Sequence, residues 1–314
     1  MDLKSRIKKK ALIQAEKIIL NLKKSDLKYP PIFVVGTLRS GTTILYQYLN
    51  YYYKFAYFPN IARGKNAHHP YLSTYLNGSY KTFHPSFKSS YGDIEGESSP
   101  SDGWEVFHRW FSYYMNPSKT KKGDLNELLK LVSVFEKLYK APFINKNNSN
   151  TLRIIELNHL FPNALFINVK RNIYDTLASV IEGRRRNKIP DDKFWSVAPE
   201  KELLNISFES ELDLIVFQYL FNIHFVDEAY KRGLIKNLIS IDYEDFCLNQ
   251  QTLIKKIEEK YGAANLVRRE NLNEDALIKR GNKKNNLIEI IDPLLEKNNT
   301  IVPKIVEEII SKNF

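Results

Sequence analysis

Residues 32–49 read Ile32-Phe-Val-Val-Gly-Thr-Leu-Arg-Ser-Gly-Thr-Thr-Ile-Leu-Tyr-Gln-Tyr-Leu49. The first four form a continuous apolar run, which is typical of a strand buried on both faces of a parallel sheet. From Ile44 onward, apolar side chains recur at helical spacing. This stretch therefore predicts a strand, a tight loop and a helix, and the rest of the fold can be built outward from it.

The loop between this strand and helix is a predicted anion site. Gly36 and Gly41 permit a tight turn, Ser40 is the expected N-cap, and Thr42 and Thr43 fall in the first helical turn. Backbone amides and hydroxyl groups then converge where the helix dipole is positive. A phosphate group is the most suitable ligand for such a loop.

The spacing of the two glycines matches the nucleotide-binding pattern Gly-x4-Gly-Lys-Ser/Thr, but Thr42 stands where that pattern has lysine. The cation of this loop is Arg39 instead. The pattern Arg-Ser-Gly-Thr-Thr after a strand resembles the 5′-phosphosulfate loop of sulfotransferases that use 3′-phosphoadenosine 5′-phosphosulfate (PAPS), in particular the branch containing the tyrosylprotein sulfotransferases. The alternative is a glycine-rich turn that only connects a strand to a helix.

Length and composition favour one large domain. The chain has 314 residues and shows no internal repeat or Pro/Ser-rich linker. Its one cysteine, Cys247, excludes an intrachain disulfide and a cysteine-based zinc site, and the six histidines lack metal-ligand spacing. No apolar run reaches the roughly 20 residues of a membrane span, and no signal-peptide core is evident. We therefore expect a cytoplasmic protein without a metal.

The N-terminal segment, residues 1–28, is a predicted basic amphipathic helix in front of a single domain, residues 29–314. Residues 1–30 hold nine Lys or Arg and three acids, so this tail supplies +6 of the net charge of +11. Apolar residues recur in it at helical spacing, so residues 1–26 are a candidate for peripheral contact with an anionic membrane. Packing against the body is the favoured alternative, because no Trp or Phe marks the apolar side. Nucleic acid is not an expected partner.

Three further apolar runs predict buried strands, at residues 142–145, 164–169 and 238–241. Helical patterns separate them, and Thr151 and Asn172 are expected to cap two of these helices. The crossover lengths suit parallel strands. The predicted fold class is α/β: a three-layer α/β/α architecture with a central parallel sheet.

The second half of the chain extends the resemblance. Residues 143–154 and 161–172 follow the sulfotransferase pattern, in which an arginine at a strand end and a serine eight residues later hold the 3′-phosphate of PAPS. Arg171 and Ser179 have that spacing. A guanidinium can pair with phosphate through two hydrogen bonds, and a hydroxyl two helical turns later can reach the same group. Residues 276–286 resemble the family's late 3′-phosphate segment.

This resemblance implies a P-loop-like PAPS sulfotransferase fold and transfer of a sulfuryl group from PAPS to an acceptor hydroxyl. The product nucleotide would be adenosine 3′,5′-bisphosphate. By the same resemblance, Arg39 and Lys146 would stabilise the transferring sulfuryl group and the leaving phosphate. Residues 40–43 would hold the 5′-phosphate. Peptide tyrosine, carbohydrate, lipid and small phenol all remain possible acceptors.

The catalytic base is where the sequence departs from the tyrosylprotein branch. That branch has a glutamate after the loop arginine, at a position occupied here by Phe58-Pro59-Asn60. Candidates for the base are Glu97, Asp102, His68 and His69, with the two acids ranked first. Both acids lie in a turn-rich segment and are equally suited to be turn and cap residues.

Two functions from other classes remain open. A P-loop kinase or NTPase would share the loop, although it would lack the phosphate-binding lysine and a clear magnesium-binding carboxylate. A non-catalytic nucleotide-binding module would keep the fold without the chemistry. Preference for magnesium and ATP would favour the first, and tight binding of the bisphosphate without transfer would favour the second.

Overall fold

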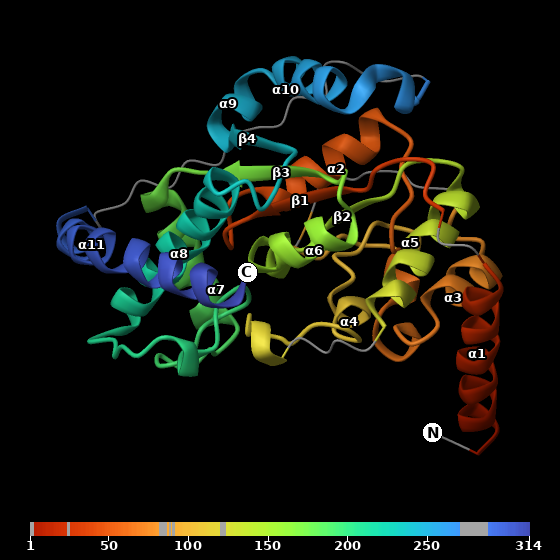
Figure 1. The fold of residues 1–314 in the computed structure, drawn as a ribbon, viewed down its shortest axis with the longest axis horizontal. Helices are drawn as coiled ribbons and strands as arrows, with labels where there is room; N and C mark the ends of the chain where they lie inside the picture. The colour runs from red at the N-terminus through yellow and green to blue at the C-terminus, as the bar shows by residue number, and fades with distance from the viewer. Residues whose placement is uncertain are drawn as a thin grey trace.

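A computed structural model describes residues 3–23, 26–81, 87, 89, 92–119, 124–270 and 288–314. The candidate 3′-phosphate segment at 276–286 lies outside these residues. The predicted α/β class is confirmed, because four parallel strands form a central sheet with helices on both faces (Figure 1).

The sheet has the strand order β2-β1-β3-β4, with every neighbouring pair parallel. The four strands are β1 (Ile32–Gly36), β2 (Ile144–Lys146), β3 (Leu165–Lys170) and β4 (Leu238–Asp242). Gly36 pairs with Val169, and Lys170 pairs with Asp242. The register therefore brings the carboxyl ends of the strands to one edge, where open α/β sheets bind ligands.

Two separate hydrophobic clusters cover the two faces of the sheet. Successive side chains of a strand point to opposite faces, so Phe33 and Val35 join one cluster while Ile32 and Val34 join the other. Figure 1 shows α2 (Thr42–Tyr52), α9 (Tyr243–Leu248) and α10 (Gln250–Ile257) on one side. The opposite side carries α5 (Leu125–Tyr139), α6 (Ile154–Leu160), α7 (Ile173–Arg186), α8 (Glu211–Lys231) and α11 (Ile288–Asn313).

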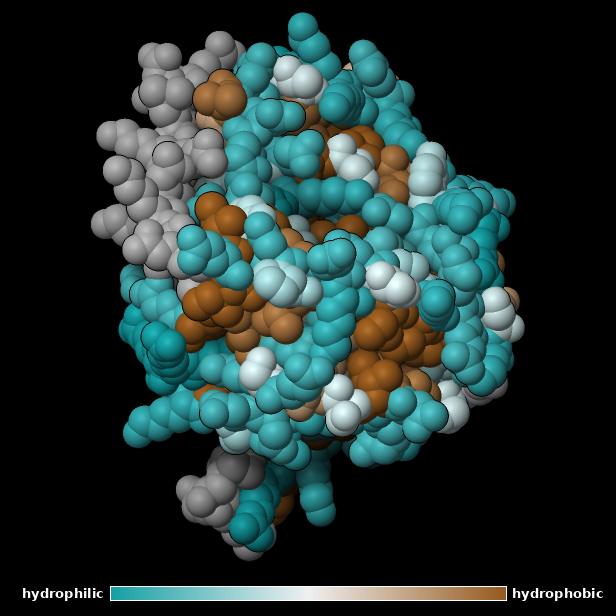
Figure 2. Space-filling model, turned by 90° about the vertical axis from the view of Figure 1, so that its left-hand side faces the viewer, coloured by the Kyte–Doolittle hydropathy of each residue, from teal (hydrophilic) through white to brown (hydrophobic). Residues whose placement is uncertain are grey.

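The terminal helices pack on the outside of these layers. α1 (Leu3–Leu22) contacts α5 and α3 (Pro70–Asn77), and α11 lies along α8. Figure 2 looks onto the face at the left of Figure 1 and shows hydrophobic residues in separate patches among hydrophilic ones. Among the helices described, none combines the length and the apolar character needed to cross a bilayer.

Short helical segments complete the described chain. They are α4 (Trp104–Phe107), the 3-10 helices Asn60–Ala62, Gly64–Asn66, Pro117–Lys119, Asn148–Arg153, Lys201–Leu203 and Ala263–Asn265, and the π-helical turn Glu258–Gly262.

Two of the three predicted helix caps are wrong. Ser40 does not cap α2, because Gly41 takes the N-cap position and the Ser40 hydroxyl donates to the Thr37 carbonyl at 2.8 Å. Thr151 lies inside a 3-10 helix and does not cap α6. The cap at Asn172 is confirmed, since its side chain accepts a hydrogen bond from a backbone amide in the first turn of α7.

Candidate functional site

The loop from Gly36 to Thr43 depends on its two glycines. Both have a positive φ, 148° at Gly36 and 96° at Gly41. A Cβ atom at Gly36 would lie 2.7 Å from the Val169 carbonyl oxygen, and one at Gly41 would lie 2.2 Å from the Tyr243 ring. Only glycine fits these two positions, which lets β3 and α9 approach the loop closely.

Side chains from the segment after β2 form hydrogen bonds that fix the loop. The Thr151 hydroxyl donates to the Gly36 carbonyl at 3.0 Å and accepts from the Gly36 amide at 2.9 Å. Asn148 accepts from the Thr42 hydroxyl at 3.1 Å and donates to the Thr37 carbonyl at 3.4 Å. The loop is therefore fixed by residues more than 100 positions away in the sequence.

The structure brings the predicted 3′-phosphate residues together with the loop arginine. Arg39 has a positive φ of 64°, and its Nε donates to the Ser179 hydroxyl at 3.0 Å. Arg171 Nη1 donates to the Arg39 carbonyl at 3.2 Å, and its guanidinium lies 4.7 Å from the centre of the Tyr243 ring. Tyr219 fixes the backbone at Arg171 by a 3.0 Å hydrogen bond. Two cations and a hydroxyl therefore converge at the strand ends.

Lys146, at the end of β2, lies at a cavity of about 260 Å³. A Cβ atom at Gly92 would lie 3.5 Å from the Lys146 ammonium and 3.8 Å from the Thr43 hydroxyl, so these two groups face the same glycine. The cavity is lined by Leu38, Gly92, Asp102, Trp104, His108, Tyr113, Lys146, Asn147, Asn148, Ser149, Trp195 and Ser196. Leu38 joins this cavity to the anion loop.

Burial changes the pKa values of Lys146 and Asp102, the ammonium and carboxyl groups of the cavity, in opposite directions. Burial lowers the pKa of the Lys146 ammonium, and the positive charge of Arg39 lowers it further. The negative charges of Asp102 and Asp93 act in the opposite direction and raise this pKa. Burial also raises the pKa of the Asp102 carboxyl, which Lys146 and Arg63 oppose. The cavity thus holds a carboxyl group of increased basicity close to an ammonium group.

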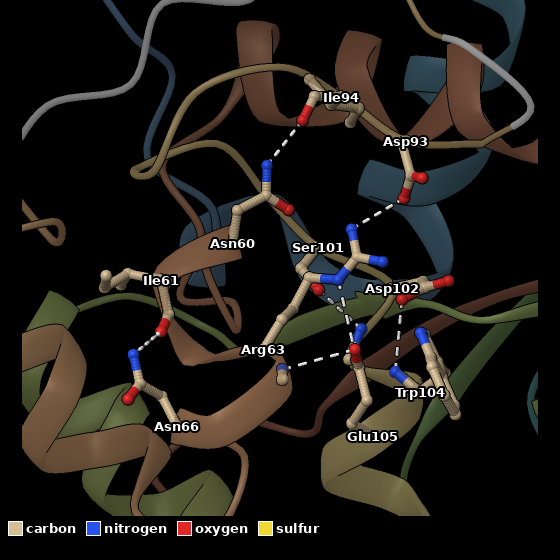
Figure 3. Close-up of polar contacts among 12 residues, drawn as sticks. Asn60, Ile61, Arg63, Asn66, Asp93, Ile94, Ser101, Asp102, Trp104 and Glu105 are labelled. Atoms are coloured by element: carbon tan, nitrogen blue, oxygen red, sulfur yellow. Dashed lines mark hydrogen bonds and ion pairs between the residues drawn. The ribbon is translucent and has the colours of Figure 1, made fainter. Parts of the chain in front are cut away.

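The segment that carries Asp102 is fastened by residues that the sequence did not indicate. We call residues 92–105 the strap. Figure 3 shows Arg63 between two carboxylates of the strap, 2.7 Å from Asp93 and 3.6 Å from Glu105. The side-chain amide of Asn60 donates to two carbonyls of the strap, at 2.5 and 2.8 Å. Arg63 therefore joins the two ends of the strap on both sides of Asp102, and Asn60 holds the part of the strap that precedes Asp102.

The opposite wall of the cavity is fastened by α8. The Gln218 side chain donates to the carbonyls of Trp195 and Val197, both at 2.7 Å, and Asn222 donates to Val197 at 3.2 Å. Between these residues, Ser196 has a φ of 65°, which is unfavourable for a non-glycine residue. Buried amides of α8 thus hold a strained turn, residues 194–198, at the cavity.

Aromatic rings form part of the lining. Trp104 contacts His108 edge to face, with ring centres 5.2 Å apart, and His108 stacks on Tyr113 at 5.5 Å. Trp104 and Tyr113 remain 39% and 47% exposed. The open side of the cavity is therefore lined with rings that present both apolar faces and polar edges.

Of the four candidate bases, Asp102 lines the cavity with Lys146. Glu97 is exposed and accepts a hydrogen bond from Asn77 at 3.3 Å. His68 is exposed, and His69 is buried beside a groove that borders α1. The structure therefore separates Glu97 and both histidines from the Lys146 cavity.

Comparison with known proteins identifies the class. Residues 30–264 match the model of the Sulfotransferase family, and the chain belongs to that family. Its fold is similar to sulfotransferase STF9 from Mycobacterium avium, with a TM-score of 0.52 and 16% identity over 80% of this chain and 67% of that one. Sulfotransferase STF1 from Mycobacterium tuberculosis H37Rv gives a TM-score of 0.51 and 13% identity over 80% and 72%. No curated protein matches the sequence.

Proposed function

We propose that the chain transfers a sulfuryl group from PAPS to an acceptor hydroxyl and releases adenosine 3′,5′-bisphosphate. The observation that carries this proposal is that the anion loop, residues 36–43, and the cavity that contains Lys146 lie next to each other at one edge of the sheet. The anion loop leaves β1, the cavity of Lys146 and Asp102 opens beside the end of β2, and Leu38 belongs to both. A donor phosphate and an acceptor hydroxyl would therefore meet beside Lys146.

On the donor side, the backbone amides and hydroxyl groups of residues 40–43 would hold the 5′-phosphate at the start of α2. Arg171 and Ser179 would hold the 3′-phosphate. Arg39 and Lys146 would face the sulfuryl group, where negative charge moves toward the leaving phosphate during transfer. The proximity of Arg39 to both Ser179 and the Lys146 charge supports this arrangement.

On the acceptor side, Asp102 would accept the proton of the attacking hydroxyl. The acceptor oxygen forms a bond to sulfur, the bond from sulfur to the 5′-phosphate oxygen breaks, and the proton passes to the Asp102 carboxylate. The raised pKa of Asp102 makes it a stronger base than an exposed aspartate. The strap and residues 194–198 would hold the acceptor in line with the leaving group.

The rings of Trp104, His108 and Tyr113 favour an acceptor with a ring, such as a phenol or a sugar. We place the reaction in the cytoplasm, whose reducing conditions suit the single buried Cys247.

The test is transfer of labelled sulfate from PAPS to a panel of phenols, sugars, lipids and tyrosine peptides. We expect transfer to at least one ring-bearing acceptor, and transfer slower by about a hundredfold or more with Asp102→Asn. Bisphosphate binding without transfer to any acceptor would indicate a non-catalytic module. Labelled phosphate transfer from magnesium ATP would identify a kinase and contradict the proposal.

A further inference from the structure

The N-terminal helix α1 has two apolar sides, and the body of the protein covers only one. Leu20 and Glu16 are 1% exposed where α1 packs on α3 and α5. Ile7 and Ile18 are 59% exposed, and Leu22 is 80% exposed. These three residues are 11 and 4 positions apart, close to whole turns of a helix, so they form one stripe. The predicted packing against the body therefore leaves a second apolar stripe open.

The charges of α1 are almost all of one sign. Its sequence contains six Lys or Arg and one acid, Glu16. Glu16 is buried, accepts a hydrogen bond from the Leu72 amide at 2.9 Å, and has a pKa raised by burial to about 8. The exposed surface of α1 therefore has no carboxylate of its own to balance its cations.

A groove between α1 and the segment around α3 extends this basic surface. It has a volume of about 440 Å³, and its lining combines Lys8, Lys9 and Lys65 with apolar side chains such as Leu12 and Ile61 and with polar ones such as Asn66, Ser73 and Asn77. None of these three lysines forms an ion pair with a carboxylate in the described part of the chain. Apolar surface combined with basic side chains is the pattern that binds anionic amphiphiles.

We propose that α1 is a docking surface for an anionic lipid membrane. Ile7, Ile18 and Leu22 enter the boundary between headgroups and acyl chains, while the lysines contact lipid phosphates. The N-terminal end of α1 projects from the body in both views, so a flat surface can reach it (Figures 1 and 2).

Charge distinguishes a membrane from the other possible occupants of the stripe. A second copy of α1 placed on this stripe would bring two rows of cations together, which is repulsive. Nucleic acid would bind the cations, but it would gain nothing from the exposed apolar stripe. An anionic membrane satisfies the cations and covers the apolar residues at once.

The experiment is sedimentation of the full chain with phosphatidylcholine vesicles, with and without phosphatidylglycerol, at low and high salt. We expect salt-sensitive binding only to the anionic vesicles. Ile7→Gln with Ile18→Gln should weaken it roughly tenfold through the apolar stripe. Lys8→Gln, Lys10→Gln and Lys17→Gln together should weaken it to a similar degree.

Control variants remove exposed apolar and basic side chains from other helices. Leu248→Gln changes a residue of α9 that is 80% exposed, and Lys255→Gln with Lys256→Gln and Lys304→Gln removes three exposed charges from other helices. Both controls should bind anionic vesicles as the wild type does. Transfer to a soluble acceptor should be unchanged in all variants, so this proposal and the proposed function fail separately.

Three results would overturn the proposal. The first is the absence of binding to anionic vesicles, and the second is equal binding by the stripe variant, which would indicate charge attraction alone. The third is a concentration-dependent dimer that the stripe variant abolishes, which would assign the stripe to a second copy of the chain.

Discussion

The two halves of the candidate site are built in different ways. The proposed donor half, formed by residues 36–43 with Arg171 and Ser179, lies on strand ends and in the N-terminal halves of helices. The proposed acceptor half is formed by the strap and by residues 194–198, which have little regular structure of their own. Long-range hydrogen bonds and ion pairs fasten the acceptor half to the body.

This difference between the two halves predicts how each of them responds to a substitution. The anion loop is held at both ends by β1 and α2 and between them by the buried Thr151 and by Asn148, so the loss of a phosphate-binding side chain such as Arg171 should lower affinity and leave the loop in place. A segment without regular structure keeps its position through individual side-chain contacts, such as those of Arg63 and Gln218. The loss of one such contact should let part of the cavity wall move. Substitutions in the two halves should therefore affect different measurable quantities, donor affinity in one and acceptor turnover or KM in the other.

The largest effect is expected from Asp102→Asn. Loss of the base should reduce turnover by about a hundredfold or more, while affinity for adenosine 3′,5′-bisphosphate stays unchanged. Glu97→Gln is the matched control, because Glu97 is exposed outside the cavity, and it should retain wild-type turnover. Full activity of Asp102→Asn in steady-state assays would remove Asp102 from the mechanism.

The next effect concerns the donor half. Gly41→Ala forces a side chain into a positive φ and against the Tyr243 ring, so bisphosphate affinity should fall at least roughly tenfold. Gly64→Ala is the control, since Gly64 also has a positive φ, 57°, but open space around it. Calorimetric affinities that fall equally in both variants would indicate a general loss of stability and would contradict a specific role for the close approach of α9 to Gly41.

A smaller effect is expected from Gln218→Met, which removes two hydrogen bonds to residues 194–198. The KM for the acceptor should rise about three- to tenfold, with bisphosphate affinity unchanged. Asn158→Leu is a matched loss of a buried amide that donates to a backbone carbonyl at 3.0 Å, away from the cavity. It should lower the melting temperature without changing KM, and a KM effect in both variants would contradict a local role for Gln218.

The smallest effect is a change in pH dependence. In the proposed mechanism Asp102 can accept a proton only when its carboxyl group is deprotonated, and the positive charge of Arg63 favours that form. Arg63→Gln should raise the pKa of Asp102, so the acidic limb of the profile of kcat/KM should move to higher pH, by roughly one unit or less. Arg232→Gln, which breaks a surface pair with Glu228, should leave the limb in place. A shift to lower pH would contradict the assignment.

Much of the fold was predictable because its signals are local. Apolar runs located the four strands, and the helical patterns between them gave the parallel sheet. The cap at Ser40 was predicted wrongly because the Ser40 hydroxyl has two possible local partners, a backbone amide in the first turn of α2 and the Thr37 carbonyl, and it bonds to the carbonyl. The glycine at 41 adopts the left-handed conformation that ends the loop, and the Ser40 hydroxyl turns back to the Thr37 carbonyl.

The fastening of the acceptor half was not predictable in the same way. Arg63 lies 30 positions from Asp93 and 42 from Glu105, and no sequence period relates them. One signal was present in α8, where Gln218 and Asn222 are spaced one helical turn apart within a largely buried apolar helix. Buried amides need hydrogen-bond partners, so such a pair indicates a segment held against the helix.

The most direct test of this division is a calorimetric titration of adenosine 3′,5′-bisphosphate and of AMP into the wild type, Arg171→Ala and Asp102→Asn. We predict that the wild type prefers the bisphosphate, that Arg171→Ala loses roughly ten- to a hundredfold in affinity for it, and that Asp102→Asn binds it as the wild type does. Equal affinity of the wild type for both nucleotides would contradict the account, as would an Arg171→Ala variant that binds the bisphosphate unchanged.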